Sequence, residues 1–409
     1  MKTLLAPLSV MGALALATSA VAAPPVQQEA PRATVVPNDF PLGHRCYIDP
    51  KAPVCPLLQY IKEPDWSKAE DVIILPHRGY WGFGAVANVP ENSLTAYLDV
   101  FQHDYNSSEA DFMPTLDGNG TVMSHDYVLT RLTQAPPLDT ARIYDQTSTY
   151  MASLKLRNRF FAISDDHVVS GKQAIDFLSA PHGKSKDPAI IFVDIKQKPD
   201  SDPAKFATNW VNTLQRILLT ATADQLYGLV VKTPFSPSFI LKNLSADARC
   251  RFTQVLWMPQ VASDSYYQGT PPGVDPNVKS SADFVDDWNR DELVLAYETN
   301  YKDPDDSRLK EFTRNGVGYA NILDYIRKTT NHRGGVFAEE PVGERGVVNR
   351  QAVWAYKNAK EDMRGDFVFE AVEPQWGNFI VVTTDRPDVW EQVKKYAWGY
   401  EVTAHNPHR

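Results

Sequence analysis

The chain has few cysteines, no excess of positive charge and, beyond its first residues, no long apolar run. Among 409 residues there are three cysteines, and 41 lysines and arginines face 50 aspartates and glutamates, for a net charge of -9. This acidic balance gives no electrostatic reason to expect a nucleic acid as partner. The lack of a second apolar stretch argues against a stable membrane span. No Cys-x-x-Cys pair occurs, so a zinc ribbon or thioredoxin-like site is not expected.

The N-terminus is the exception to this lack of apolar runs. One lysine precedes an apolar stretch that ends in Ala20-Val21-Ala22. This is the pattern of a secretory signal with a small-x-small cleavage site, so residues 1–22 are expected to be a signal peptide. A membrane anchor is the alternative, but Pro7 interrupts the run. The predicted location is therefore secreted, either extracellular or periplasmic.

Export changes the meaning of the cysteines. In an oxidising compartment Cys46 and Cys55 are close enough in sequence to close a small disulfide loop. Cys250 is then left over and is expected to be a buried thiol, with a bridge to the N-terminal pair as the alternative. Residues 23–70 are rich in proline and polar residues, and we interpret them as a linker and a stapled N-terminal extension. Asn-x-Ser/Thr triplets, which are glycosylation acceptors only in a eukaryotic secretory pathway, begin at Asn106, Asn119 and Asn243.

After residue 70, short apolar runs alternate with amphipathic helical patterns. The runs are VIIL (72–75), the segment around Glu109, IIFVDI (190–195), LVV (229–231), VLWM (255–258), LVLAY (293–297), VFA (336–338) and FIVVTT (379–384). Continuous apolar strands alternating with helices indicate a parallel α/β sheet that is covered on both faces. Eight units over about 330 residues favour a (β/α)8 TIM barrel, placed at residues 71–400, over a doubly wound sheet.

Reactive residues of such a barrel lie at the C-terminal ends of its strands. The first apolar run leads directly into His77 and Arg78, and Gly79 lets the chain turn. This pair suits a phosphate substrate, because arginine donates a charged fork of hydrogen bonds and histidine can move a proton near neutral pH. An ordinary loop is the alternative.

The second expected strand carries two carboxylates, Glu109 and Asp111. Residues two apart in a strand point the same way, so both side chains can converge on one cation. Oxygen ligands of this kind suit a hard ion such as Mg²⁺ or Ca²⁺. A solvated polar face is the alternative.

The third expected strand ends in Asp194 and Lys196, two charges inside an apolar run. Charges placed there are costly unless they are paired or metal-bound. We interpret them as a third metal ligand and a phosphate-facing lysine, with a salt bridge between them as the alternative. His125, beside Asp126 after a DGNG turn, supplies a second histidine. One imidazole could then act as general base while the other protonates the leaving group.

Taken in order, these motifs resemble the glycerophosphodiester phosphodiesterase family, of the PLC-like phosphodiesterase TIM-barrel superfamily. The resemblance covers roughly residues 71–395. The matching segments are HRG (77–79), PENSLTAY (90–97), EADFMPTLDG (109–118), HDYVLTR (125–131), VDIK (193–196) and VVTTDRPD (381–388). No single one of these motifs is specific to the family, but their occurrence together in this order is.

Residue by residue, the resemblance implies that His77 and His125 are the catalytic acid/base pair. It implies one divalent cation, Mg²⁺ or Ca²⁺, held by Glu109, Asp111 and Asp194.

The remaining implied roles concern the substrate. Arg78 and Lys196 would hold phosphate oxygens, and Glu91 would lie at the mouth of the site as a further substrate-binding residue. The implied activity is secreted, metal-dependent hydrolysis of glycerophosphodiesters to an alcohol and glycerol phosphate. The expected partner is a small-molecule or lipid phosphodiester, and the expected state is a monomer.

Departures from the family pattern leave alternatives. The third ligand is typically glutamate in the family, and Asp194-x-Lys also resembles the related sphingomyelinase D and phospholipase D toxins. One alternative is therefore a lyase that forms cyclic phosphates from lysophospholipids, although those relatives lack the PEN and HDxxLxR segments. Another is an inactive barrel used as a binding module. A secreted glycosidase would pair Glu298 with Glu339 or Glu340.

Aromatic residues near the expected strand ends offer contacts for a headgroup. Tyr80, Trp81, Trp257, Tyr297 and Trp376 could meet choline or a lipid through cation–π and apolar contacts. Simple packing is the alternative for each.

Overall fold

The computed structural model describes residues 73–82, 84–118, 120–135, 140–182, 189–289, 293–300, 306–330, 332–337 and 379–388. The expected signal peptide and the stapled extension with Cys46 and Cys55 lie outside the described residues. So do Glu339, Glu340 and Trp376.

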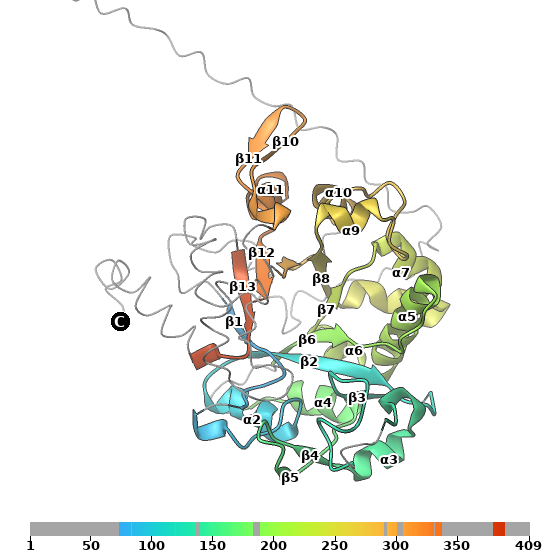
Figure 1. Ribbon diagram of the computed structural model, residues 1–409, viewed down its shortest axis with the longest axis vertical. Helices are drawn as coiled ribbons and strands as arrows, with labels where there is room; N and C mark the ends of the chain where they lie inside the picture. Colours follow the sequence, from blue (N-terminus) through green and yellow to red (C-terminus); the bar gives the residue numbers. More distant parts are fainter. Residues whose placement is uncertain are drawn as a thin grey trace, which may run out of the picture. The chain divides into compact units, whose positions relative to one another are not determined.

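Within these residues, eight parallel strands form the central sheet (Figure 1). They are β1 (Ile73–Pro76), β2 (Ser107–Pro114), β6 (Ile190–Ile195), β7 (Leu229–Thr233), β8 (Leu256–Val261), β9 (Tyr297–Thr299), β12 (Gly334–Phe337) and β13 (Phe379–Thr384). Neighbours pair in chain order from β2 to β13, and β13 then pairs with β1. At the β1–β2 seam Ser108 Oγ lies 3.5 Å from the carbonyl oxygen of Pro76. The predicted TIM barrel is thereby confirmed.

The chain between β2 and α4 departs from a simple strand–helix repeat. Here β3 (Thr121–Met123) pairs antiparallel with the end of β2. It is followed by η3 (Ile143–Asp145), α3 (Ser148–Ser153) and the hairpin of β4 (Lys155–Arg157) and β5 (Ile163–His167). We call residues 115–170 the insert. Most of its apolar residues form a second cluster together with Met113 of β2, among them Leu129, Ile143, Met151, Leu154 and Leu156, whereas Met123 and Val169 belong to the main core.

Helices follow the strands around the barrel (Figure 1). The α-helices among the described residues are α2 (Leu94–Gln102), α4 (Gly171–Leu178), α5 (Pro203–Thr220), α6 (Ala223–Leu226), α7 (Pro237–Asn243), α8 (Ala246–Arg251), α9 (Asp264–Gln268), α10 (Ser281–Trp288) and α11 (Ile322–Thr329), besides α3. Shorter elements are η2 (Gly84–Val86), η4 (Phe252–Gln254), η5 (Ser307–Leu309) and the hairpin of β10 (Phe312–Arg314) and β11 (Val317–Tyr319). In the part of the chain described, no helix has the length and apolar character needed to cross a bilayer.

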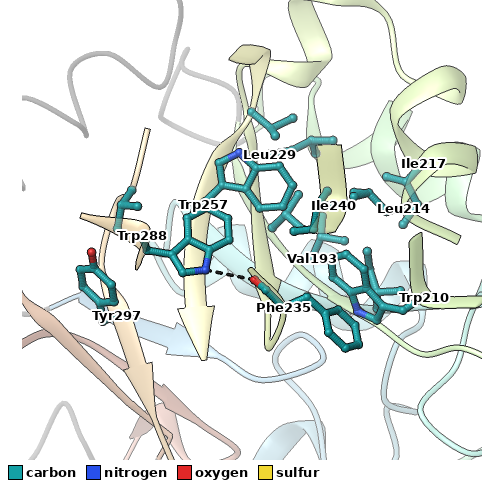
Figure 2. Close-up of a cluster of buried hydrophobic side chains, with 14 of the residues drawn as sticks. Val193, Trp210, Leu214, Ile217, Leu229, Phe235, Ile240, Trp257, Trp288 and Tyr297 are labelled. Atoms are coloured by element: carbon teal, nitrogen blue, oxygen red, sulfur yellow. Dashed lines mark hydrogen bonds between the residues drawn. The ribbon is translucent and has the colours of Figure 1, made fainter. Parts of the chain in front are cut away.

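The main core lies between the strands and their covering helices. Figure 2 shows Trp257 and Trp288 together here, with the Trp288 indole donating to the carbonyl oxygen of Phe235 at 3.0 Å. Trp257 and Tyr297 are fully buried. Packing, and not headgroup contact, is therefore the role of these two aromatic residues. The apolar runs became strands because both of their faces are covered, as a parallel sheet requires.

Two expectations differ from the structure. The run LVLAY was expected to be a strand, but β9 begins only at Tyr297, and Val294 forms an isolated bridge with Trp257. Cys250 was expected to be buried, and this is wrong because its side chain is exposed. On α8 the buried residue is Ala248, and a residue two positions further along a helix points to the opposite side.

Candidate active site

The turn after β1 places the first two predicted site residues. The His77 backbone N–H donates to the carbonyl oxygen of Thr384 at 2.9 Å, which continues the β1–β13 pairing. Arg78 has a φ of 62°, a conformation that non-glycine residues rarely adopt. Gly79 follows with a φ of 90°, and a Cβ there would lie 2.7 Å from that of Ala96. Only glycine fits at this position. The turn brings the side chains of His77 and Arg78 over the end of the barrel.

His77 is buried between two carboxylates. Its Nδ1 lies 2.6 Å from Asp385 Oδ1, just past the end of β13, and its Nε2 lies 3.3 Å from Glu109 Oε2. Burial holds the pKa of His77 well below its usual value, and the charge of Arg78 acts in the same direction. Burial also raises the pKa of Asp385 to about 7. The contacts of His77 with Asp385 on one side and Glu109 on the other fix the orientation of its imidazole.

Glu109, Asp111 and Asp194 form one carboxylate cluster. Asp111 on β2 is the register partner of Asp194 on β6. One oxygen from each of the three residues can be chosen so that all lie within 4.8 Å of one another. Asp111 Oδ1 is buried and accepts no hydrogen bond from the described residues, although Lys196 Nζ lies 3.2 Å away. Three oxygen donors of this kind, one of them without a hydrogen bond, fit a hard divalent cation.

The charges around this cluster shift its pKa values in opposite directions. Burial raises the pKa of Glu109 to about 8, against the effect of Lys232 and with a further rise from Asp111. Burial would also raise the pKa of Asp111, but Lys196 and Arg78 hold it well below its usual value. Lys196 Nζ lies 3.0 Å from Asp194 Oδ2, so the salt bridge considered as the alternative is present, and Asp194 is also a member of the carboxylate cluster.

Lys232 on β7 was not predicted from the sequence, yet it lies at the centre of the buried charges. Its ammonium group has no exposed surface and lies 3.2 Å from Glu109 Oε1 and 2.7 Å from Glu298 Oε1. It also lies over the Phe337 ring, 5.4 Å from the centroid. Burial would lower the pKa of Lys232, but the two glutamates raise it. Glu298, considered above as a glycosidase acid, is thus a counter-ion to Lys232.

The segment PEN supplies two further residues to the site, Glu91 and Asn92. Glu91 Oε1 accepts from Arg78 Nη1 at 3.2 Å. Asn92, with a φ of 54°, donates from Nδ2 to Asp111 Oδ2 at 2.8 Å and accepts from the Asp111 backbone N–H at 3.2 Å. Burial would raise the pKa of Glu91, but Arg131 and Arg78 lower it. Glu91 therefore fixes Arg78 beside the cluster, and Asn92 fixes Asp111 within it.

The second histidine lies at the start of the insert. His125 Nδ1 lies 2.9 Å from Asp126 Oδ1, and the His125 side chain is 27% exposed. Arg131 donates to both Asp126 oxygens and, at 3.1 and 2.7 Å, to both oxygens of Glu91. His125 is close enough for its charge to lower the pKa of Asp111. Arg131 thus connects the second histidine to the barrel mouth.

A small hollow lies beside this network. It is lined by Trp81, Glu91, Arg131, Leu132, Arg157, Asn158, Arg159 and Phe161. Trp81 is also fixed by its indole, which donates to the His77 carbonyl oxygen at 3.0 Å. The hollow therefore joins the barrel mouth to the hairpin of the insert.

All eight residues singled out from the sequence gather at one end of the barrel. Those that sequence reasoning missed are Asn92, Arg131, Asp385 and Lys232. The first three fall inside the motifs PEN, HDYVLTR and VVTTDRPD, where their position was a usable signal. Lys232 had a weaker signal, a single charge at the end of an apolar run, which is the signal that selected Asp194.

Comparison with known proteins adds information on the fold. Neither a family model nor a curated protein matches this chain. A Silicibacter pomeroyi structure named for glycerophosphoryl diester phosphodiesterase is 14% identical, covers 79% of this chain and 92% of its own, and gives a TM-score of 0.51. At that identity the likeness establishes a shared fold.

Two other solved structures give lower scores. A glycerophosphoryl diester phosphodiesterase from Parabacteroides distasonis is 14% identical, covers 84% of this chain and 92% of its own, with a TM-score of 0.49. A phosphodiesterase from Oleispira antarctica, in complex with the product sn-glycerol-3-phosphate, is 14% identical, covers 80% and 98%, and has a TM-score of 0.45.

Proposed function

We propose that this chain is a metal-dependent glycerophosphodiester phosphodiesterase, a phosphoric diester hydrolase that yields an alcohol and glycerol phosphate. One observation carries the proposal: a three-carboxylate cluster lies beside two histidines, each with its own aspartate. The fold shared with the Silicibacter pomeroyi protein supports the same reading. An inactive binding barrel would have no need for two oriented imidazoles.

The carboxylate cluster is assigned to one Mg²⁺ or Ca²⁺ ion. When bound, the ion would supply positive charge for a phosphodiester oxygen and offset the charge that builds on phosphorus. Arg78 and Lys196 are assigned to the remaining phosphate oxygens, because both already contact the carboxylates that define the site. Glu91 keeps the Arg78 guanidinium in place.

The two histidines divide the proton transfers. Asp385 holds Nδ1 of His77 and Asp126 faces Nδ1 of His125, so Nε2 is the nitrogen that we assign to proton transfer in each. One imidazole takes the proton of the nucleophile, which is water or a neighbouring hydroxyl of the glycerol moiety. The other gives a proton to the oxygen of the departing alcohol.

The proposal is tested with glycerophosphocholine and phosphorus NMR. We expect wild type to release glycerol phosphate, and His77→Asn and His125→Asn each to lower the rate by about a hundred- to ten-thousand-fold without unfolding. Full activity in either variant would sink the assignment. A cyclic phosphate as the final product would favour the lyase, since the nucleophile would then be the substrate's own hydroxyl.

The metal assignment has a separate test that does not depend on turnover. Isothermal titration of the chelator-treated protein with Mg²⁺ and Ca²⁺ is expected to show one site. Asp111→Asn should weaken it by at least about ten-fold, because a neutral amide is a poorer ligand for a hard cation. The matched control is Asp176→Asn on α4, where the carboxylate is exposed and pairs with Lys172. Equal affinities in the two variants would contradict the three-carboxylate site.

We further propose export, on the N-terminal sequence pattern alone. Cleavage after Ala22 is expected, and N-terminal sequencing of protein recovered outside the producing cytoplasm is the direct check. Recovery of a chain that still begins at Met1 would contradict it.

A further inference from the structure

The insert carries an exposed apolar tip that the proposed chemistry leaves unused. At the β4–β5 turn, the exposed fractions of Phe160, Phe161 and Ile163 are 60%, 44% and 54%. We call these three residues the apolar tip. Single exposed apolar residues are common, but three within four positions form a patch, and patches of this kind mark binding surfaces.

The apolar tip has a fixed shape. Phe161 has a φ of 63°, and its backbone N–H donates to the Asn158 carbonyl oxygen at 2.9 Å. The Asn158 side-chain oxygen accepts from the backbone N–H groups of Phe160 and Ala162 at 2.9 and 3.0 Å. A phenylalanine in the left-handed region is strained, and such strain tends to be retained where function requires the geometry.

The apolar tip is also fastened to the loop that follows the His77 strand. Asn158 Nδ2 donates to Asn88 Oδ1 at 3.2 Å, and the buried Arg159 side chain lies beside Gly82. Phe161 lines the same hollow as Glu91 and Arg131. An apolar surface therefore begins where the charged network of the site ends.

Charged residues of the site thus lie next to the aromatic residues of the apolar tip. This arrangement matches one chemical class of ligand, a phosphodiester that carries a hydrocarbon chain. We propose that the apolar tip is a subsite for that chain, so that lysophospholipid-type diesters are preferred over water-soluble glycerophosphodiesters. The inference rests on the proposed function and leaves its chemistry unchanged. The oxygen of the nucleophile, water or the neighbouring glycerol hydroxyl, loses its proton and forms the new bond to phosphorus, the bond to the alcohol oxygen breaks, and that oxygen takes a proton.

A single chain is a better occupant than a lipid bilayer. Binding to an anionic membrane surface draws on clustered basic residues. The basic residues of the hairpin have partners within the protein instead: Lys155 pairs with Asp165 at 2.8 Å, Arg157 donates to the Phe161 carbonyl oxygen, and the buried Arg159 lies over the Phe160 ring. A polar headgroup would account for the arginines of the hollow but not for the exposed phenylalanines.

The first test measures binding and does not depend on catalysis. Titrations of hexyl-, octyl- and decylphosphocholine, each below its critical micelle concentration, are expected to show affinity rising about two- to four-fold per added methylene. The double variant Phe160→Ser/Phe161→Ser should lose most of this dependence, and Ile163→Ser part of it. Leu219→Ser, which removes a 42% exposed apolar residue on α5, should keep it. Affinity independent of chain length in wild type, or unchanged dependence in the double variant, would overturn the subsite.

The second test compares turnover of lysophosphatidylcholine and glycerophosphocholine. The ratio of their kcat/KM values is expected to fall by about ten-fold in the double variant and to stay constant in Leu219→Ser. An unchanged ratio contradicts the subsite while leaving the phosphodiesterase assignment intact. If neither substrate is hydrolysed, the proposed function fails, and the alkylphosphocholine titrations still decide the subsite. Loss of vesicle pelleting in the double variant without loss of chain-length dependence would identify a membrane contact instead.

Discussion

The two histidines of the candidate site are held by two different kinds of structure. His77 follows a barrel strand, is 1% exposed, and meets an aspartate 308 residues away in the chain. His125 follows β3 within the insert, has a side chain that is 27% exposed, and meets the aspartate next to it in sequence. One imidazole is positioned by closure of the whole barrel and the other by a local turn.

The buried histidine is held rigidly by the barrel, whereas the partly exposed histidine of the insert is accessible to solvent. The barrel side of the site is a network of buried charges in which each group depends on several strands. The insert side has a second apolar cluster, which includes Met113 of β2, and it is joined to the barrel by the β2–β3 pairing and by contacts from Arg131 and Asn158. Substitutions on the barrel side should therefore lower stability and activity together, whereas those on the insert side should lower activity with little loss of global stability.

The largest expected effect compares the two aspartates. Asp385→Asn should lower kcat for glycerophosphocholine by about a thousand-fold, because an amide next to Nδ1 of this buried imidazole favours the wrong tautomer. Asp126→Asn should cost about ten- to a hundred-fold, because water can reach that imidazole. Steady-state kinetics of the two variants side by side gives the answer. A larger loss for Asp126→Asn would reverse the comparison.

The next effect concerns the buried ammonium on the barrel side. Lys232→Met leaves Glu109 and Glu298 without their shared counter-ion, and removing one partner of a buried ion pair costs about 3–5 kcal/mol of unfolding free energy. Lys172→Met, in an exposed pair with Asp176 on α4, should cost under about 1 kcal/mol. Urea unfolding measures both. Similar losses of unfolding free energy in the two variants would show that the charges around Lys232 are exposed to solvent.

A third experiment asks whether the insert opens independently of the barrel. Leu214→Ala truncates a fully buried side chain of the main core, and Leu156→Ala truncates one in the cluster of the insert. Each is expected to cost about 2–5 kcal/mol locally. Hydrogen exchange should show faster exchange throughout for the first variant and only within residues 115–170 for the second. Global acceleration in both would make the insert part of one cooperative unit.

The smallest effect is a pH dependence at the junction of barrel and insert. Hydrogen bonds from Ser148 and Thr115 lower the pKa of Asp117 to about 2. Because the folded pKa lies below the unfolded one, near 3.9, this stabilisation is complete above about pH 4 and is lost as the pH falls toward 2. The group is largely solvated, so the contribution is under about 1 kcal/mol. The stability difference between wild type and Asp117→Asn should be present at neutral pH and shrink in acid; a constant difference would contradict it.

Much of the barrel could be predicted because parallel strands leave an unambiguous pattern. Apolar runs covered on both faces, such as IIFVDI, have few other structures available to them. The carboxylate cluster could be predicted for the same reason, since the pleat of β2 fixes Glu109 and Asp111 on one side and strand pairing brings Asp194 beside them.

Other features of the structure could not be predicted, because they depend on contacts between residues that are far apart in the sequence. Lys232 reads as a strand-end lysine until β7 is placed between β6 and β8, where its ammonium group meets glutamates from β2 and β9. The exposure of Phe160 and Phe161 leaves no signal in the sequence, because apolar side chains are usually buried. Cys250 was misplaced because one cysteine on a short helix carries no information about which face is covered.

The closure of the barrel has a consequence for the biogenesis of the protein. Asp385 immediately follows β13, which pairs with both β12 and β1, so the carboxylate that holds His77 arrives only when the last strand docks against the first. Contacts of such sequence separation form late and slowly in folding. A chain from which β13 has not yet emerged therefore lacks an oriented His77, and the candidate site forms only once that strand has docked.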